Sequence, residues 1–552
     1  MRLLTVVLIA SGLAGNVGCR KQESGETTGP AARDEVLVRY HFVGTTSLTD
    51  NTNASRFREL WNLPETRRLV EQTLQKLAHA PRTLYGDSVT PAQDERGAAL
   101  LRPMLDDLPR HESFVQVRGS ADKTAEWTLL VKLPADRLKL WRANLRELMQ
   151  VWQLGKAATN MVEGFAAWEV ERTDAPALVR CVEAGPWLAL GVGQRAMTAV
   201  HEALRRIKSG GRPIAVASNY WLEAELNLPR LGAVLDFPPT IQWPRAKCTV
   251  TGSGENLRSK ARLIFPANVT GPLEPWQIPT NIINDPLISF TAVRGVSPWL
   301  KECAMLRQLG LNPAPNELFF WAQGQLTFQS YLAFPLKQAA SQLERAANRA
   351  PSLLGTNWHD RGMGHIGWRT NTHEMVWTLP YINPFLKPTD YQGTEFVFGG
   401  LFPPSPLTNP PPGELLSELA TEPKLVYYDW EITQARLTSW RIMAQLFAML
   451  ADKPQLTTNT ASLAWMMAVE SKLGNTITEV TAESPVEWSV ARKSHLGFTA
   501  VELVALTRWL ESVAFPKLSF ELPADRTPRP ASKSPPPAAN APTQPAPRPP
   551  GP

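Results

Sequence analysis

The sequence lacks the short motifs that mark the common classes of enzyme and cofactor-binding protein. It contains no GxSxG nucleophile motif, no Walker A lysine motif and no HExxH zinc motif. Its four cysteines include no CxxC pair, which excludes a zinc ribbon or a thioredoxin-like redox site. The net charge of +6 is not concentrated in a basic stretch, which argues against a dedicated nucleic-acid binder. The sequence therefore gives no positive sign of an enzyme, a cofactor or a nucleic-acid partner.

The N-terminus carries an apolar run that is too short to cross a membrane. Arg2 precedes an apolar stretch over residues 3–15, and Gly18 stands directly before Cys19. A membrane-spanning helix needs about 20 apolar residues. A basic residue, a short apolar run and a small residue before a cleavage point are instead typical of a signal peptide, which predicts that the chain is exported.

This leader resembles a bacterial lipoprotein signal peptide, in which the cysteine after the cut carries acyl chains such as palmitate and becomes the new N-terminus. The resemblance implies cleavage after residue 18 and lipidation of Cys19. It further implies that the membrane is a partner, and that the protein lies at the cell membrane or outer membrane, facing the periplasm or the exterior. Asn16 stands where such signals usually carry leucine, so two alternatives stay open. Ordinary cleavage after Ala14 would leave Cys19 free, and an uncleaved leader would itself be the anchor.

Polar, proline-containing segments flank the body of the chain. Residues 19–34 are polar with Gly and Pro, which suits a flexible tether. Residues 523–552 are rich in proline and poor in apolar side chains, so we expect a disordered tail with polyproline II character. A further proline-rich stretch, 380–423, is expected to form a surface excursion within the body.

One pattern recurs between these ends, in which two alternating apolar stretches flank a polar turn and then stop at a proline. Such alternation is typical of β-hairpins, and proline cannot donate a hydrogen bond to the ladder. The segments lie at 114–134, 248–266, 318–335 and 362–380. Helical periodicity follows the first and the third. We therefore predict an α+β protein built from duplicated antiparallel β-hairpin plus helix modules.

Length and periodicity set the expected organisation of the body. A chain of 552 residues predicts about three domains, and after the signal peptide at 1–18 we place α+β module regions at 35–212, 213–345 and 346–522. Thr499 and Glu502 have the spacing of a helix capping box. Periodic apolar residues predict helices at 64–78, 194–208, 434–450, 462–473 and 499–512.

The segment WHDRGMGHIGWRTNTHE holds the densest group of side chains with metal-ligand chemistry. It supplies His359, Asp360, His365, His373 and Glu374 among only eight histidines in the chain. A catalytic zinc site needs three such ligands and an open position. A three-residue hairpin turn would place His365 and His373 on one face, whereas a four-residue turn would separate them. Because no fixed ligand spacing is present, we expect structural histidines and no metal.

We expect the tryptophans and the remaining cysteines to be buried in the hydrophobic core. An odd number of cysteines, Cys181, Cys248 and Cys303, allows at most one internal disulfide and favours buried thiols. An exposed row of tryptophans could instead bind polysaccharide or an apolar ligand. The tryptophans that fall on predicted apolar faces are Trp61, Trp127, Trp141, Trp152, Trp221, Trp321, Trp377, Trp440, Trp465 and Trp509.

The chain as a whole resembles large uncharacterised lipoprotein-type exported proteins of environmental bacteria, through its leader, its Trp-rich hairpins and its Pro-rich tail. That resemblance carries no functional residues. The leading hypothesis is a lipid-anchored envelope protein with a non-catalytic binding or scaffolding role, whose partners would be the membrane and an envelope protein or polysaccharide. The alternatives are a metal-dependent hydrolase centred on the hairpin at 359–374, and a carrier of an apolar ligand.

Overall fold

A computed structural model describes residues 35–517 of the chain. It leaves out 49–50, 86–88, 120–124, 172–177, 194–196, 216–219, 236–241, 325–328, 355–363, 380–381, 405–408 and 451–459. The chain divides into a compact unit that ends at Lys517 and a remainder, 518–552, that lies outside the described residues. The predicted signal peptide, tether and tail also fall outside them.

The described chain is an α+β protein with one antiparallel sheet of 20 strands, as the sequence predicts for the fold class. Strand pairing gives the first ten strands the order 4-5-6-7-3-2-1-8-9-10. In that order they are β4 (Ala157–Val162), β5 (Phe165–Glu171), β6 (Leu178–Ala184), β7 (Trp187–Gly193), β3 (Ala125–Lys132), β2 (Ser113–Gly119), β1 (Glu35–Phe42), β8 (Leu222–Asn227), β9 (Arg245–Ser253) and β10 (Asn256–Ile264).

The other ten strands repeat this order with every number raised by ten, 14-15-16-17-13-12-11-18-19-20. In that order they are β14 (His365–Arg369), β15 (Glu374–Thr378), β16 (Phe385–Tyr391), β17 (Thr394–Gly400), β13 (Ser330–Pro335), β12 (Glu317–Gln323), β11 (Leu287–Arg294), β18 (Leu425–Ile432), β19 (Asn475–Ser484) and β20 (Glu487–Ser494). We call strands β1–β10 the first half and β11–β20 the second half.

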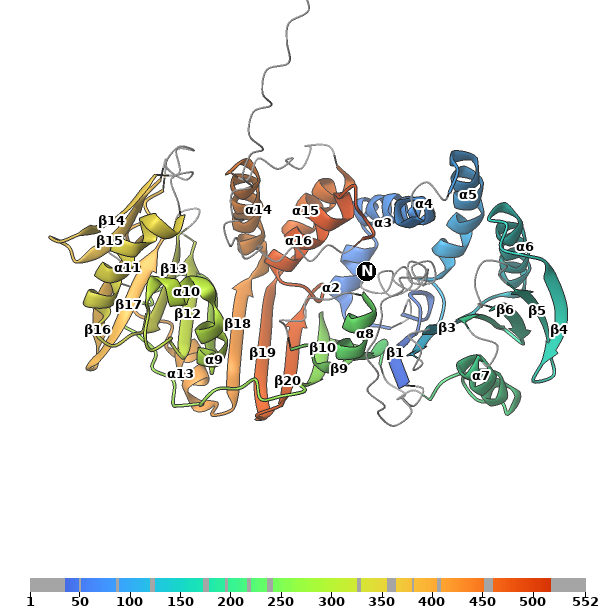
Figure 1. The fold of residues 1–552 in the computed structure, drawn as a ribbon, viewed down its shortest axis with the longest axis horizontal. Helices are drawn as coiled ribbons and strands as arrows, with labels where there is room; N and C mark the ends of the chain where they lie inside the picture. The colour runs from blue at the N-terminus through green and yellow to red at the C-terminus, as the bar shows by residue number, and fades with distance from the viewer. Residues whose placement is uncertain are drawn as a thin grey trace, which may run out of the picture. The chain divides into compact units, whose positions relative to one another are not determined.

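The two halves are joined by pairing of β10 with β20, which hold the same position in the two orders. Eight residue pairs run antiparallel from Leu257 opposite Ser494 to Ile264 opposite Glu487. In Figure 1 the red and orange strands β20, β19 and β18 continue through this junction into the green strands β10 and β9. The junction makes a single continuous sheet out of two ten-strand halves.

The expected repeat of hairpin-plus-helix modules is not confirmed. Each of the four predicted hairpins is an antiparallel pair, namely β2–β3, β9–β10, β12–β13 and β14–β15. Only β2–β3 and β12–β13 occupy corresponding places in the two halves. Strand pairing also crosses the expected domain ranges, because β8 in the range 213–345 pairs with β1 in the range 35–212.

Helices connect the strands and cover the sheet. None of them, within the described residues, is long and apolar enough to span a membrane. They are η1 (Thr46–Leu48), α2 (Ser55–Trp61), α3 (Pro64–Ala78), α4 (Ala80–Tyr85), α5 (Pro91–Asp107), α6 (Ala135–Val151), α7 (Thr198–Lys208), α8 (Leu228–Leu235), α9 (Ser297–Glu302), α10 (Ala304–Leu309), α11 (Ala339–Leu354), α13 (Gly413–Thr421), α14 (Thr433–Leu450), α15 (Ala461–Glu470) and α16 (Ala500–Glu511).

Local sequence signals placed several helices correctly. Helix α3 has the predicted bounds, and its first residue is the proline that suits a helix start. Helix α16 begins with the predicted capping box, in which Thr499 accepts a hydrogen bond from the Glu502 amide and the Glu502 carboxylate accepts one from the Thr499 amide. Helix α7 is shorter at its start than expected, since it begins at Thr198.

The two halves differ in how one face of the sheet is covered. In the first half, α5 and α6 pack on β3, β5, β6 and β7 in a core that includes Leu100, Met104, Leu148, Val131 and Leu188. The connection from β1 to β2 supplies α2, α3, α4 and α5 to this face, whereas the connection from β11 to β12 holds only the six-residue helices α9 and α10. In the second half α11 packs on the corresponding strands, and this connection supplies no helix of the length of α5.

The proline-rich stretch 380–423 is not a surface excursion. It contains the hairpin β16–β17 and helix α13, and Phe385, Phe396 and Phe398 are buried in the core of the second half. The prolines are compatible with this hairpin because most of them lie outside the strands. The exception is Pro388, which lies in β16 opposite Val397 of β17.

A buried carboxylate ties α5 to α6. Asp107 is 3% exposed, and it accepts hydrogen bonds from Arg137 Nε at 2.9 Å and from Trp141 Nε1 at 2.7 Å. Its neighbour Asp106 is more exposed and pairs with Arg102 along the same helix. Both carboxylates are thus engaged in structural contacts.

Replacing Asp107 by alanine is expected to lower the free energy of unfolding by about 3 kcal/mol, because two donors lose their buried acceptor. Asp106→Ala is the matched control and should cost less than about 1 kcal/mol, as for a surface ion pair. Urea unfolding of the two variants measures the difference. Equal losses would contradict the assigned role of Asp107.

Candidate functional site: two apolar cavities

Two apolar cavities lie on the same face of the sheet. Residues directly opposite each other on neighbouring strands share a face, so the pairing registers identify which side chains lie together. One cross-strand row passes through both cavities. It consists of Phe42, Leu222, Val250, Ser259, Arg492, Thr478, Asp429, Thr291, Phe320, Leu332, Gly399, Leu386 and Met375.

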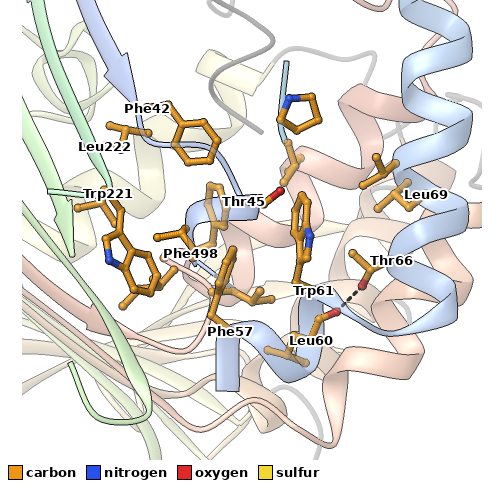
Figure 2. Close-up of a pocket in the computed structure, with 18 of the residues that line it drawn as sticks. Phe42, Thr45, Phe57, Leu60, Trp61, Thr66, Leu69, Trp221, Leu222 and Phe498 are labelled. Carbon is orange, nitrogen blue, oxygen red and sulfur yellow. Dashed lines mark hydrogen bonds between the residues drawn. The ribbon is translucent and has the colours of Figure 1, made fainter. Parts of the chain in front are cut away.

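The first cavity has a volume of about 270 Å³ and lies over β1, β8, β9 and β10. Figure 2 shows Phe42, Trp221 and Leu222 on the sheet side, facing Trp61 of α2 and Leu69 of α3 across the cavity. The segment 496–498 and residues of α15 and α16 complete the wall. An apolar cavity of about 150 Å³ is enough to bind benzene, so this space can hold a larger apolar group.

The polar groups of the first cavity are few and uncharged. Its lining, taken over the described residues, contains hydroxyl groups but no Asp, Glu, Lys, Arg or His. Thr66 donates to the Leu60 carbonyl at 2.6 Å and accepts from Trp465 Nε1 at 3.0 Å. The Thr66 hydroxyl is therefore occupied within the protein, and the cavity is suited to an uncharged apolar group.

The second cavity is larger, about 600 Å³, and lies over β11, β12, β13, β15 and β16 beside α14. This volume is within the range of small-molecule sites. Phe320, Leu332, Leu386 and Met375 follow one another across its floor. Phe320 is 41% exposed, which is unusual for a phenylalanine in the middle of a sheet.

Arg436 of α14 is the one charged residue that lines the second cavity, as far as the described residues show. Its Nε is buried and has no hydrogen-bond partner among them, and its guanidinium lies over the Trp440 ring at 5.2 Å. Burial lowers the pKa of Arg436 from its ordinary value, because desolvation disfavours the charged form. The cavity thus combines an apolar floor with a single cation.

Two carboxyl groups on β18 lie near Arg436 and are bound elsewhere. Asp429 accepts a hydrogen bond from Thr291 Oγ1 at 2.6 Å, and Glu431 accepts one from the Ala500 amide at 2.7 Å, at the start of α16. Burial raises the pKa of Glu431 to about 7 and raises that of Asp429 above its usual range. These carboxyls stabilise Arg436 through space without forming an ion pair with it.

The structure does not bring His365 and His373 together. Arg369 pairs with Glu374, so the hairpin has a four-residue turn, 370–373. Four residues is the turn length expected to separate the two histidines, although the turn lies one position further along the chain than that alternative placed it. His365 lies at the far end of β14 opposite Thr378, and His373 lies in the turn with φ of 49°. About 13 Å of strand separates them at about 3.3 Å per residue. His359 and Asp360 lie outside the described residues.

Glu374 and His373 make contacts within the hairpin itself. Glu374 forms an ion pair with Arg369 at 3.2 Å, and the His373 ring lies 6.3 Å from the Trp368 ring. Among the described residues, no three His, Cys, Asp or Glu side chains lie close enough to hold a metal ion together.

The cysteines form no disulfide within the described chain. Cys181, Cys248 and Cys303 are not joined to one another by a disulfide. Cys181 is fully buried in the sheet, and burial raises its pKa to about 12. Cys19, the predicted lipidation site, lies outside the described residues.

The tryptophans divide between cavity walls and cores. Trp61, Trp221 and Trp465 line the first cavity, and Trp321, Trp377 and Trp440 line the second. The other four tryptophans on predicted apolar faces pack in or against hydrophobic cores, and they are Trp127, Trp141, Trp152 and Trp509. Sequence reasoning did not single out Arg436. The sequence of α14 contains two arginines, Arg436 and Arg441, and does not by itself distinguish the one that lines the cavity.

Comparison with known proteins does not identify this chain. No family model and no curated protein matches it. A solved structure, crystal form I of TP0453, matches with 8% sequence identity and a TM-score of 0.20, over 42% of this chain and 98% of that one. A likeness at this TM-score supports no conclusion about fold or function.

The separation of the histidines predicts that they are dispensable. A double variant, His365→Ala with His373→Gly, should unfold within about 0.5 kcal/mol of the native protein, because His365 is exposed and glycine accepts the positive φ at position 373. Elemental analysis of both purified proteins should find no stoichiometric zinc or iron. One metal per chain in the native protein, lost in the variant, would contradict this prediction.

Proposed function

We propose that this protein is a non-catalytic binding protein for an apolar ligand, exported and held at a membrane surface through Cys19. The observation that supports binding is the apolar floor of the second cavity, which the helices cover only in part and where Phe320 stays 41% exposed. The first half buries its β3, β5, β6 and β7 beneath α5 and α6, whereas the second half leaves a cavity of about 600 Å³ over strands that include β13, β15 and β16. A ligand would take the place of the missing cover.

Energetics favour occupation of this cavity by an apolar molecule. Removing apolar surface from water is worth about 25 cal/mol per Å². Phe320 keeps 41% of its surface exposed at the floor, and Trp377 and Trp440 add large aromatic surfaces to the wall. A ligand that covers these groups gains their burial without a rearrangement of the sheet.

The membrane location is supported by the leader alone. Arg2, the apolar run at 3–15, and Gly18 before Cys19 are the features that indicate export and lipidation. The membrane would be one partner, through the anchor, and a lipid-anchored body with apolar cavities is suited to a ligand that comes from the membrane or the envelope. An envelope protein or polysaccharide is a less favoured partner, because the tryptophans gather in cavities.

We also infer that the body consists of two duplicated units of ten strands, each with its own helices. The support is the strand order, because each strand of β1–β10 has the same place in its half as the strand numbered ten higher has in the other half. Pairing of equivalent strands β10 and β20 in antiparallel fashion is the arrangement expected for two units related by a two-fold axis. The repeated unit is then larger than a hairpin with one helix.

A metal-dependent hydrolase at 359–374 is the weaker alternative. Glu374 is engaged by Arg369, and the described histidines of the hairpin stand at its opposite ends. No reaction is assigned to the site.

Binding can be tested with N-phenyl-1-naphthylamine, an uncharged probe that fluoresces in apolar surroundings. The native protein should bind it with micromolar affinity. Ser439→Trp, which fills the second cavity from α14, should weaken binding at that cavity about tenfold or more. Gln434→Trp adds the same side chain at an exposed position of the same helix and should leave binding unchanged. Absence of probe binding by the native protein would refute the proposed function.

The anchor is tested separately. Cys19→Ala should move the protein from the detergent phase to the aqueous phase in a phase-partitioning assay, because each acyl chain adds about 0.8 kcal/mol of membrane affinity per buried methylene. Equal membrane retention of the native protein and the variant would contradict lipidation at Cys19.

A further inference from the structure

We propose that the ligand of the second cavity is a long-chain carboxylate, with its acidic head at Arg436 and its chain along the apolar floor. This inference rests on the proposed function, and it adds the chemical class of the ligand. An uncharged apolar molecule would fill the floor but would leave the Nε of Arg436 without a hydrogen-bond acceptor.

The position of Arg436 supports an anionic head group. Its guanidinium lines the cavity at one side, and its Nε is buried with no hydrogen-bond partner among the described residues. A buried charge is costly unless it is paired and hydrogen-bonded. A carboxylate matches the planar fork of a guanidinium and can accept two hydrogen bonds from it.

The acidic neighbours of Arg436 do not fill this role. Asp429 is bound to Thr291, and Glu431 is bound to the first turn of α16. Arg492, a half-buried cation of the same face, already forms an ion pair with Glu502 at 2.7 Å. Arg436 is therefore the cation of this group that remains available to a ligand.

The remainder of the cavity fits an unbranched hydrocarbon chain. From Arg436 the wall continues through Ser439, Trp440 and Met443 along one side of α14. The floor runs across five strands from Phe320 of β12 to Met375 of β15. A cation at one side of an elongated apolar floor is the arrangement that a single-chain amphiphile requires.

The test compares palmitate with hexadecanol, which has the same chain and no charge, using the fluorescence of the intrinsic tryptophans. The native protein should bind palmitate at least tenfold more tightly. Arg436→Gln should weaken palmitate binding about 10- to 100-fold, the range for hydrogen bonds to a charged group, and should change hexadecanol binding less than about threefold. Arg436→Lys should restore part of the preference. Arg345→Gln, which removes an exposed arginine of α11, is the matched control.

A second variant keeps the test decisive if Arg436→Gln does not fold. Ser439→Asp places a carboxylate one helical turn from Arg436 and should weaken palmitate binding while it strengthens the binding of hexadecylamine. Equal affinity of the native protein for palmitate and hexadecanol would overturn the carboxylate assignment and leave the proposed function intact. Failure to bind either compound would overturn both.

Discussion

Pairing of β10 with β20 is the interaction on which the rest of the architecture depends. Without it, each ten-strand half would end in an open edge strand with unpaired backbone groups, which invites association with other chains. The junction also carries an ion pair between Arg262 and Glu487, 225 positions apart in the sequence. Because the sheet is continuous here, helix α16, which follows β20, can cover strands of the first half, and the segment 496–498 closes the first cavity.

A polar group at the centre of the shared face keeps the two cavities apart. Along the cross-strand row, Ser259 of the first cavity is followed by Arg492 and Thr478, which are hydrogen-bonded to each other at 2.9 Å. Asp429 and Thr291 come next and form a hydrogen bond of their own. Because these polar groups satisfy one another, they form a hydrogen-bonded band between the two apolar linings. The two cavities are therefore separate sites.

The sequence predicted what depends on neighbouring residues and missed what depends on distant ones. Helix α3 and the capping box at Thr499 follow from local propensity and hydrogen bonding, and they were predicted correctly. The register of the histidine hairpin could not be predicted, because a one-residue difference in the turn decides which side chains share a face. The prediction of a surface excursion at 380–423 was wrong because it relied on local composition. The prolines of this stretch suggested a loop, yet the consecutive apolar residues at 396–398 fit a strand that is buried on both faces.

The cavities themselves could not be predicted from apolar periodicity, because the same pattern describes a core residue and a cavity wall. Trp141 and Trp440 both lie on apolar faces of helices, and only the packing of the opposite element distinguishes them. A usable signal lies in the connections. In the first half, residues 43–112 connect β1 to β2, whereas in the second half the shorter segment 295–316 connects β11 to β12. Given the repeated strand order, the shorter connection implies an apolar face with too little helix to cover it. That deficit, together with the position of Arg436 beside the apolar floor, supports the proposed site for an amphiphile.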